Sequence, residues 1–587
     1  MGRLISLLLD NTPRALLRGW AAPAVAAALA AAAATAPVLA RQSLEIDGQL
    51  AAPVEQSLLE LARGAGSEND GGSIAATRRQ LLVLLRSEGY YGAVVRERWR
   101  ENEIIYDVSP GLRFGIGDLE VETEPDQPAA RALALTAAQL EPGAPLRARA
   151  VIAGEARALA ALQENGWPDA VILERQVTVD HSSAQGAVTL KFQTGAFSRY
   201  GEIQVGAADW RAEFIRRLAP TPPGEPVQLS ALRHYQSRLT ALDGVARASV
   251  RLAEAEAPLE QRDLLVDITP SARNVLEAGF SVSTSEGGGV DGAWTRRNVF
   301  GGDESVTLNA QLSTLEQSIG GALSAPHWRK LDQTLTLLAA ARNEETDAFD
   351  QQEIEAEIDV TRRLSPAWSG GVQLGLDVSR VRTNGQQEDT VTTSAGVSAV
   401  YDNRDSVIEP TRGARAVFQV SPAITVGDIQ SGYVISEASL QSYRRLGGRL
   451  IAAGRVRLGG LIGAGVDSVP ADARFYAGGG GSVRGFEFQS LGPATADGRP
   501  SGGRSVIEAS AELRWRGEGR WGAALFADAG VASPDATPDL ADMRVGVGAG
   551  LRYHFDFAPL RLDIAAPLDR RSDEASLHVY LGLGQAF

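Results

Sequence analysis

The chain has 587 residues, 44% of them hydrophobic, a formal net charge of −15 and no cysteine. This length allows several domains, and the missing cysteines exclude disulfides and thiolate metal sites within the sequence. The acidic balance argues against a nucleic acid partner, because nucleic acid phosphates would be repelled.

The first 40 residues have the pattern of a secretory signal peptide. Arginines precede an alanine-rich apolar run that begins at Trp20 and ends in small residues at Ala40. We therefore expect residues 1–40 to be removed on export. The run is just long enough to span a bilayer, so an uncleaved anchor is the alternative, but Pro23 and Pro37 argue against it.

A repeat fills residues 41–272, in which a strand pattern, amphipathic helices and two further strands follow one another three times. Each repeat closes its helical part with a glycine, at Gly89, Gly166 and Gly244, roughly 77 residues apart. We expect Gly89 and Gly166 to adopt a left-handed conformation that stops the helix. The predicted modules are residues 41–112, 113–196 and 197–272.

This order of elements resembles the POTRA domain, a periplasmic module of outer-membrane assembly proteins. The repeated glycine with an aromatic or apolar residue after it is the most specific local feature of the resemblance. It implies that the modules bind an extended chain by adding it to a sheet edge. The alternative is that the first two modules are rigid spacers that hold the rest of the chain near a partner.

Residues 273–587 follow a different pattern, in which apolar and polar residues alternate over many segments. In residues 545–555 the odd positions are apolar or aromatic and the even positions are glycine or polar. Sixteen such segments predict a 16-stranded antiparallel transmembrane β-barrel, with one face toward lipid and the other toward a polar lumen. A soluble β-sandwich is the alternative, but it needs fewer and shorter strands.

A glycine-rich segment, FYAGGGGSVRGFEFQSLGP at residues 475–493, lies between two groups of these strands. Its aromatic residues need a surface to pack against, and its arginine, Arg484, needs a carboxylate partner if it is buried. By alternation, Glu512 and Asp528 point into the lumen on the two strands that follow. We expect the loop to fold into the barrel with Arg484 paired to one of them. The alternatives are an exposed external loop and lumen charges that only solvate a pore.

A Val-Arg-Gly-Phe motif thus lies between barrel strands and behind three modules. Its residues are Val483, Arg484, Gly485 and Phe486. With this arrangement the chain resembles the outer-membrane protein assembly superfamily, and the number of modules resembles the TamA branch of that superfamily. The resemblance implies that Arg484 sits within the barrel and engages Glu512 and Asp528.

The same resemblance implies a weak seam where the first and last barrel strands meet. An opened seam exposes two strand edges, which can template an incoming strand by hydrogen bonding. Glycines weaken the last strand further, because glycine packs poorly in a sheet. The terminal Phe587 also resembles the aromatic end that assembly machinery reads in barrel proteins. The expected seam residues are Leu276, Ala278, Phe280, Val579, Leu581, Gly582, Gly584 and Phe587.

The function implied by the resemblance is that of an outer-membrane assembly factor, not an enzyme. It inserts or translocates autotransporter-type and other β-barrel proteins through the opening seam, with its amino-terminal modules in the periplasm. The implied partners are the outer-membrane lipid bilayer, unfolded β-barrel or autotransporter clients and a TamB-like inner-membrane-anchored protein. No cofactor or metal is expected, because the five histidines are scattered without catalytic or metal-ligand spacing. The alternatives are a two-partner secretion pore for a dedicated exported protein and a passive porin.

Overall fold

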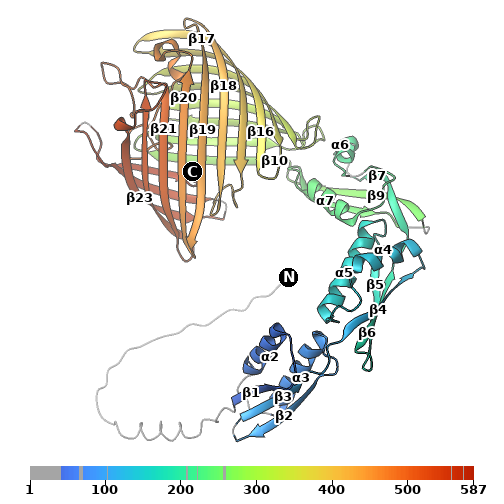
Figure 1. The fold of residues 1–587 in the computed structure, drawn as a ribbon. Coiled ribbons are helices and arrows are strands. Elements are labelled where there is room, and N and C mark those ends of the chain that lie inside the picture. Colours follow the sequence, from blue (N-terminus) through green and yellow to red (C-terminus); the bar gives the residue numbers. More distant parts are fainter. Residues whose placement is uncertain are drawn as a thin grey trace, which may run out of the picture. The chain divides into compact units, whose positions relative to one another are not determined.

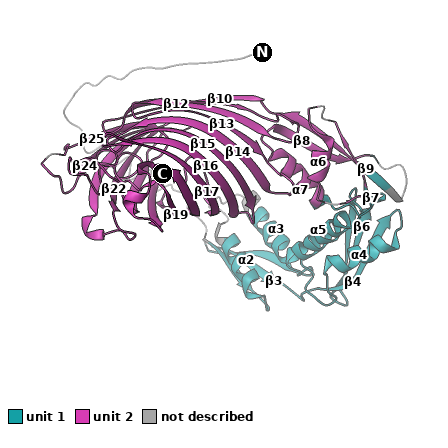
Figure 2. Ribbon diagram, turned by 90° about the horizontal axis from the view of Figure 1, so that it is seen from above, with its two compact units in different colours: residues 1–200, 224–230, 254–262 teal, residues 201–223, 231–253, 263–587 magenta. Residues whose placement is uncertain are grey.

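A computed structural model of the chain describes residues 41–64, 71–101, 103–206, 209–220, 222–254, 259–556, 558–572 and 574–587. The expected signal peptide, residues 1–40, lies outside these ranges. The chain divides into two compact units, which Figure 2 shows in teal and magenta. Among the described residues, no helix is both long and apolar enough to cross a membrane.

The chain before the barrel forms three α+β modules, each with helices and a three-stranded sheet, as the repeat predicts (Figure 1). In each sheet the last strand of the module is central, which leaves the other two strands as edges. The first module contains β1 (Arg41–Ile46), α2 (Ala52–Gly64), α3 (Gly71–Ser87), β2 (Val94–Arg100) and β3 (Glu103–Ser109). The second contains β4 (Gly115–Glu124), α4 (Pro128–Ala138), α5 (Ala148–Glu164), β5 (Val171–Asp180) and β6 (Gln185–Gln193). The third contains β7 (Phe197–Val205), α6 (Ala212–Arg217), α7 (Leu229–Thr240), β8 (Val245–Leu252) and β9 (Leu259–Pro270).

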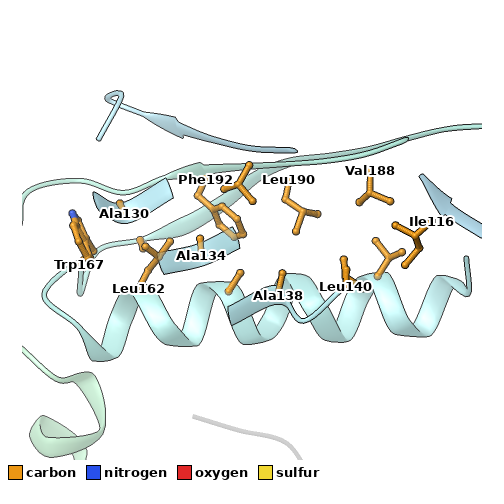
Figure 3. Close-up of a cluster of buried hydrophobic side chains, with 14 of the residues drawn as sticks. Ile116, Ala130, Ala134, Ala138, Leu140, Leu162, Trp167, Val188, Leu190 and Phe192 are labelled. Carbon is orange, nitrogen blue, oxygen red and sulfur yellow. The ribbon is translucent and has the colours of Figure 1, made fainter. Parts of the chain in front are cut away.

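The core of the second module shows how the sequence produces this fold (Figure 3). Strand β6 turns every second side chain, Val188, Leu190 and Phe192, toward the helices, where all three are buried. Each contributes about 1.5–3 kcal/mol by leaving water. Helix α4 meets them with small buried residues at every fourth position, which share one helix face and let the helices pack closely. These are Ala130, Ala134 and Ala138.

Gly166 follows the end of helix α5 with a left-handed φ of +101°, as predicted, and Gly89 likewise has φ +98°. A Cβ added to Gly166 would lie 2.4 Å from Cε2 of Phe197. We expect Gly166→Ala to destabilise the second module by roughly 3 kcal/mol, because left-handed strain of about 1–2 kcal/mol adds to the cost of overpacking. Amide hydrogen exchange of β6 in the full chain measures this loss.

Gly143, in the same module, offers the matched control. Its φ is also left-handed, at +82°, but no atom lies within 4 Å of an added Cβ. Gly143→Ala therefore introduces the left-handed backbone strain without overpacking, and it should destabilise the second module by about 1–2 kcal/mol. Equal losses for the two variants would show that the contact with Phe197 contributes nothing.

The rest of the chain forms a closed antiparallel barrel of sixteen strands, as the alternation predicts (Figure 1). The first eight strands are β10 (Asn274–Ser283), β11 (Gly287–Arg296), β12 (Ser305–Ser313), β13 (Glu316–Ala325), β14 (Gln333–Glu345), β15 (Asp350–Arg363), β16 (Trp368–Thr383) and β17 (Gln386–Asp402). The last eight are β18 (Gly413–Gly427), β19 (Ser431–Gly447), β20 (Leu450–Ile462), β21 (Ser505–Arg516), β22 (Trp521–Ser533), β23 (Arg544–His554), β24 (Pro559–Pro567) and β25 (His578–Leu583).

Side chains alternate between the two faces of the barrel. On β16, Val372, Leu374 and Leu376 point outward and are 45–58% exposed although they are apolar. On the neighbouring β15, Glu353 and Glu355 point inward and are partly buried. An apolar outer surface around a polar lumen is the pattern of a barrel whose outer face contacts lipid.

Candidate functional site

The connection between β20 and β21, residues 463–504, folds back inside the barrel. Its side chains Phe475, Val483 and Phe486 are at most 4% exposed and belong to one apolar cluster with Leu461 of β20 and Val506 of β21. An external loop would leave these side chains in water. The cluster therefore rules out the external-loop alternative.

Arg484 lies at the centre of this loop and contacts three carboxylates on the barrel wall. Its Nε and Nη2 donate to the two oxygens of Asp528 at 2.6 and 3.0 Å. Its Nη1 donates to Glu512 at 2.7 Å and to Asp563 at 3.1 Å. The guanidinium carbon also lies 3.5 Å from the ring centroid of Phe526, which adds a cation–π contact. The arginine that the sequence singles out thus contacts both of the carboxylates that alternation placed in the lumen.

Two further arginines balance the charge of this network. Arg514 Nε donates to the second oxygen of Glu512 at 2.7 Å, and Arg552 Nη1 donates to the second oxygen of Asp563. Three guanidinium groups therefore face three carboxylates, all buried. Burying charge is costly unless each group is paired and hydrogen-bonded, so this balance is what permits a charged cluster inside the barrel.

Glycines on the barrel wall let the loop approach. A Cβ at Gly546 of β23 would lie 1.9 Å from the carbonyl oxygen of Arg484, and one at Gly550 would lie 1.9 Å from Asp563 Oδ1. No side chain fits at Gly546 while the loop is docked, and none fits at Gly550 beside Asp563 and Arg552. Gly546 thus lets the loop approach β23, and Gly550 makes room for the Arg552–Asp563 pair.

Sequence reasoning missed two contributors to this site. Asp563 is the one acidic residue in β24, and its inward position in an apolar strand was the signal that could have identified it. Tyr580 of β25 accepts a hydrogen bond at its hydroxyl from the backbone N–H of Gly485 at 3.1 Å. The loop therefore contacts the last strand as well as the strands that follow it.

The seam between the first and last strands is shorter than the sequence suggested. Strands β10 and β25 are paired at three positions, Ser281–Gly582, Val282–Leu581 and Ser283–Tyr580, whereas β10 and β11 are paired at ten. Of the expected seam residues, Leu581 and Gly582 lie in this pairing. Val579 pairs with β24, and its backbone exchanges hydrogen bonds with Thr284 beyond the end of β10.

Three of the expected seam residues lie on the seam edge of β10 but are not paired with β25, which corrects the predicted extent of the pairing. Leu276, Ala278 and Phe280 are on the part of β10 that pairs with β11 alone. The last strand was expected to run to the end of the chain, but it ends at Leu583. Gly584 donates a last hydrogen bond to Pro559 of β24, and its left-handed φ of +95° then turns the chain away from the sheet.

The chain end turns toward the lumen. Arg514, an inward residue of the Arg484 network, donates a hydrogen bond to the carbonyl oxygen of Phe587 at 3.1 Å. Its guanidinium carbon also lies 5.0 Å from the Phe587 ring centroid. Phe587 is therefore not paired in the seam, and Arg514 links the chain end beyond β25 to Glu512 and hence to the loop.

The third module is fixed to the turn between β11 and β12. Asp303 accepts hydrogen bonds from the backbone N–H groups of Gly244 at 2.7 Å and Asp243 at 3.1 Å. Burial raises the pKa of Asp303 to about 6, and these two N–H groups oppose the rise. Asn298 donates to the carbonyl oxygen of Asp209 at 3.0 Å. The chain thus enters the barrel through a hydrogen-bonded junction.

Three carboxylates in the lumen lie close enough together to hold a metal ion. Glu353, Glu355 and Asp377 have oxygens within 4.8 Å of one another, and Arg342 lies 3.7 Å from Glu353. Acidic groups of this kind are common without an ion, so no metal role is assigned to them.

Comparison with known proteins identifies the barrel. Residues 298–587, which include the inward loop and its carboxylate partners, match the Omp85 superfamily domain. The barrel is an Omp85 superfamily domain. The predicted membership of the outer-membrane protein assembly superfamily is therefore confirmed.

The chain is also similar to individual proteins. The chain is 24% identical over 398 residues to the outer membrane protein assembly factor BamA of Nitratidesulfovibrio vulgaris, which covers 64% of this chain and 50% of the relative. The chain thus spans about half the length of that relative. The structure of BamA from Haemophilus ducreyi lacking POTRA domains 1–3 has a TM-score of 0.66 at 17% identity, covering 80% of this chain and all of that one. CdiB from Acinetobacter baumannii has a TM-score of 0.47 at 14% identity, covering 92% and 99%.

Proposed function

We propose that this protein is an outer-membrane assembly factor that inserts β-barrel clients through the seam between β10 and β25. The observation that carries this proposal is the short pairing at the seam. Strands β10 and β25 are paired at three positions, whereas β10 and β11 are paired at ten. On the seam side, residues 274–280 of β10 have no strand partner among the described residues. Their backbone groups can pair with an incoming strand.

The cost of opening the seam is small. If each paired position contributes about 1 kcal/mol, separating the three costs about 3 kcal/mol. The two hydrogen bonds between Thr284 and Val579 add to this cost. A client strand that replaces the lost hydrogen bonds therefore needs no external energy source to enter.

The apolar outer face of the barrel supports placement in the outer membrane, with the three modules in the periplasm. An edge strand of the second module, β5, is exposed along most of its length and carries the exposed residues Val171, Ile172 and Leu173. Such an edge suits binding of an extended chain by strand addition. We propose that β5 binds an extended segment of an autotransporter-type or other unfolded β-barrel client, or of a TamB-like inner-membrane-anchored partner, as in the TamA branch.

Site-specific cross-linking tests the proposal. A cysteine replaces Leu276, which is 80% exposed on the unpaired part of β10, and the full chain in liposomes is mixed with an unfolded β-barrel client. The chain has no other cysteine, so a thiol-reactive client probe reports this position alone. We expect strong cross-linking there and little at the control Ile319→Cys, which is 64% exposed on β13 away from the seam. Equal labelling at both positions would count against client entry at the seam.

A further inference from the structure

A cavity of about 310 Å³ lies where the third module joins the turn between β11 and β12. Four arginines line it, Arg211, Arg273, Arg296 and Arg297, with one carboxylate, Asp209. The chain as a whole is acidic, with a formal charge of −15, so this positive group is local. A cavity with this charge selects an anion.

Two of these arginines are not neutralised by the protein. Arg273 contacts Asp209 at 3.0 Å, and Arg211 contacts Glu304. Arg296 and Arg297 form no ion pair with the residues that the structure describes. The cavity wall thus offers two guanidinium groups whose fork of N–H donors matches phosphate oxygens.

The outer surface beside the cavity is apolar. Arg296 is the last residue of β11 and lies on the same outward face as Trp294, two residues before it. Trp294 pairs with Leu276 of β10 on one side and with Leu308 of β12 on the other. Leu276 and Leu308 are 80% and 50% exposed. A positive cavity at the end of an apolar wall has the two parts that a lipid requires, one for its headgroup and one for its chains.

We propose that this cavity binds the phosphate headgroup of an anionic phospholipid, with an acyl chain along the outward face of β10 to β12. Arg296 and Arg297 hold the phosphate, and Trp294 contacts the chain. The bound lipid lies against β10, the strand whose other edge is unpaired at residues 274–280. This lipid site lies at the junction of the third module with the barrel and does not depend on the identity of any client.

Lipid titration of the purified full chain in detergent tests the headgroup contact. The variant Arg296→Gln/Arg297→Gln should weaken binding of phosphatidylglycerol about 25-fold, since each arginine beside an anionic lipid contributes about a factor of five. The control is Arg362→Gln/Arg444→Gln, which removes two exposed arginines at the ends of β15 and β19 that do not line the cavity. Its affinity should stay within about twofold of wild type. Equal loss in both variants, or loss in neither, would overturn the proposal.

Tryptophan fluorescence tests the acyl contact and separates a lipid from a free anion. Phosphatidylglycerol with brominated chains should quench the protein more than brominated phosphatidylcholine does. The difference should fall in Trp294→Phe and persist in Trp515→Phe, which removes an outward tryptophan on β21. Inorganic phosphate that competes as well as the lipid, with no quenching of Trp294, would show a free-anion site and overturn the lipid assignment.

Discussion

Replacing Arg484 with alanine is expected to release the loop from the lumen and to abolish client insertion while the barrel still forms. The change leaves Glu512, Asp528 and Asp563 buried with two arginines in place of three. Removing one partner from a buried ion pair costs roughly 3–5 kcal/mol. This shifts the equilibrium between the docked and the released loop toward release by a factor of 100 or more. Protease sensitivity of residues 475–493 measures the release, and insertion of a β-barrel client measures the function.

Two comparison variants separate the role of this arginine from a general loss of charge. Arg499→Ala removes an exposed arginine of the same connection, paired at 3.6 Å to the exposed Asp497, and should change nothing measurable. Arg484→Lys keeps the charge but loses the two-pronged contact with Asp528, so an intermediate loss is expected. Normal client insertion by Arg484→Ala with a fully released loop would show that the docked loop is not needed.

The loop and the seam are parts of one network. Arg484 and Arg514 share Glu512 as a partner, and Arg514 holds the terminal Phe587. Gly485, next to Arg484, donates to Tyr580 of the last strand. A displaced loop therefore removes support from the strand that closes the barrel. This connection is the physical reason to expect an effect of Arg484 on an event at the seam.

The sequence predicted much of the fold because the decisive patterns are local. A period of two residues sets which side chain of a strand faces the lumen, so Glu512 and Asp528 were found without knowledge of the barrel. The three modules followed from repeated helix-ending glycines. Asp563 was missed because it lies 79 residues beyond Arg484, and nothing local says that β24 curves around to face the loop.

The seam could not be predicted from local pattern. How far β10 and β25 overlap depends on the stagger accumulated over all sixteen strands of the closed barrel. The composition of the last segment suggested a strand to Phe587. The left-handed Gly584 and the contact of Phe587 with Arg514 turn the chain inward instead. The overlap of β10 with β25 and the contact of Phe587 with Arg514 both depend on residues far apart in the sequence.

A disulfide across the seam is expected to stop client insertion, and it tests the opening more directly than any other change. Val282 and Leu581 are directly paired and both face outward, so a Val282→Cys/Leu581→Cys pair can bridge β10 and β25 without entering the lumen. The oxidised protein should lose client insertion by tenfold or more, because about 3 kcal/mol of separable pairing is replaced by a covalent bond. Reductant should restore it.

The control pair Leu551→Cys/Leu562→Cys bridges β23 and β24, which are also paired and outward-facing, and should leave insertion unchanged in either redox state. An oxidised seam that still inserts clients at the normal rate would mean that β10 and β25 stay paired during the reaction, and that clients enter by another route.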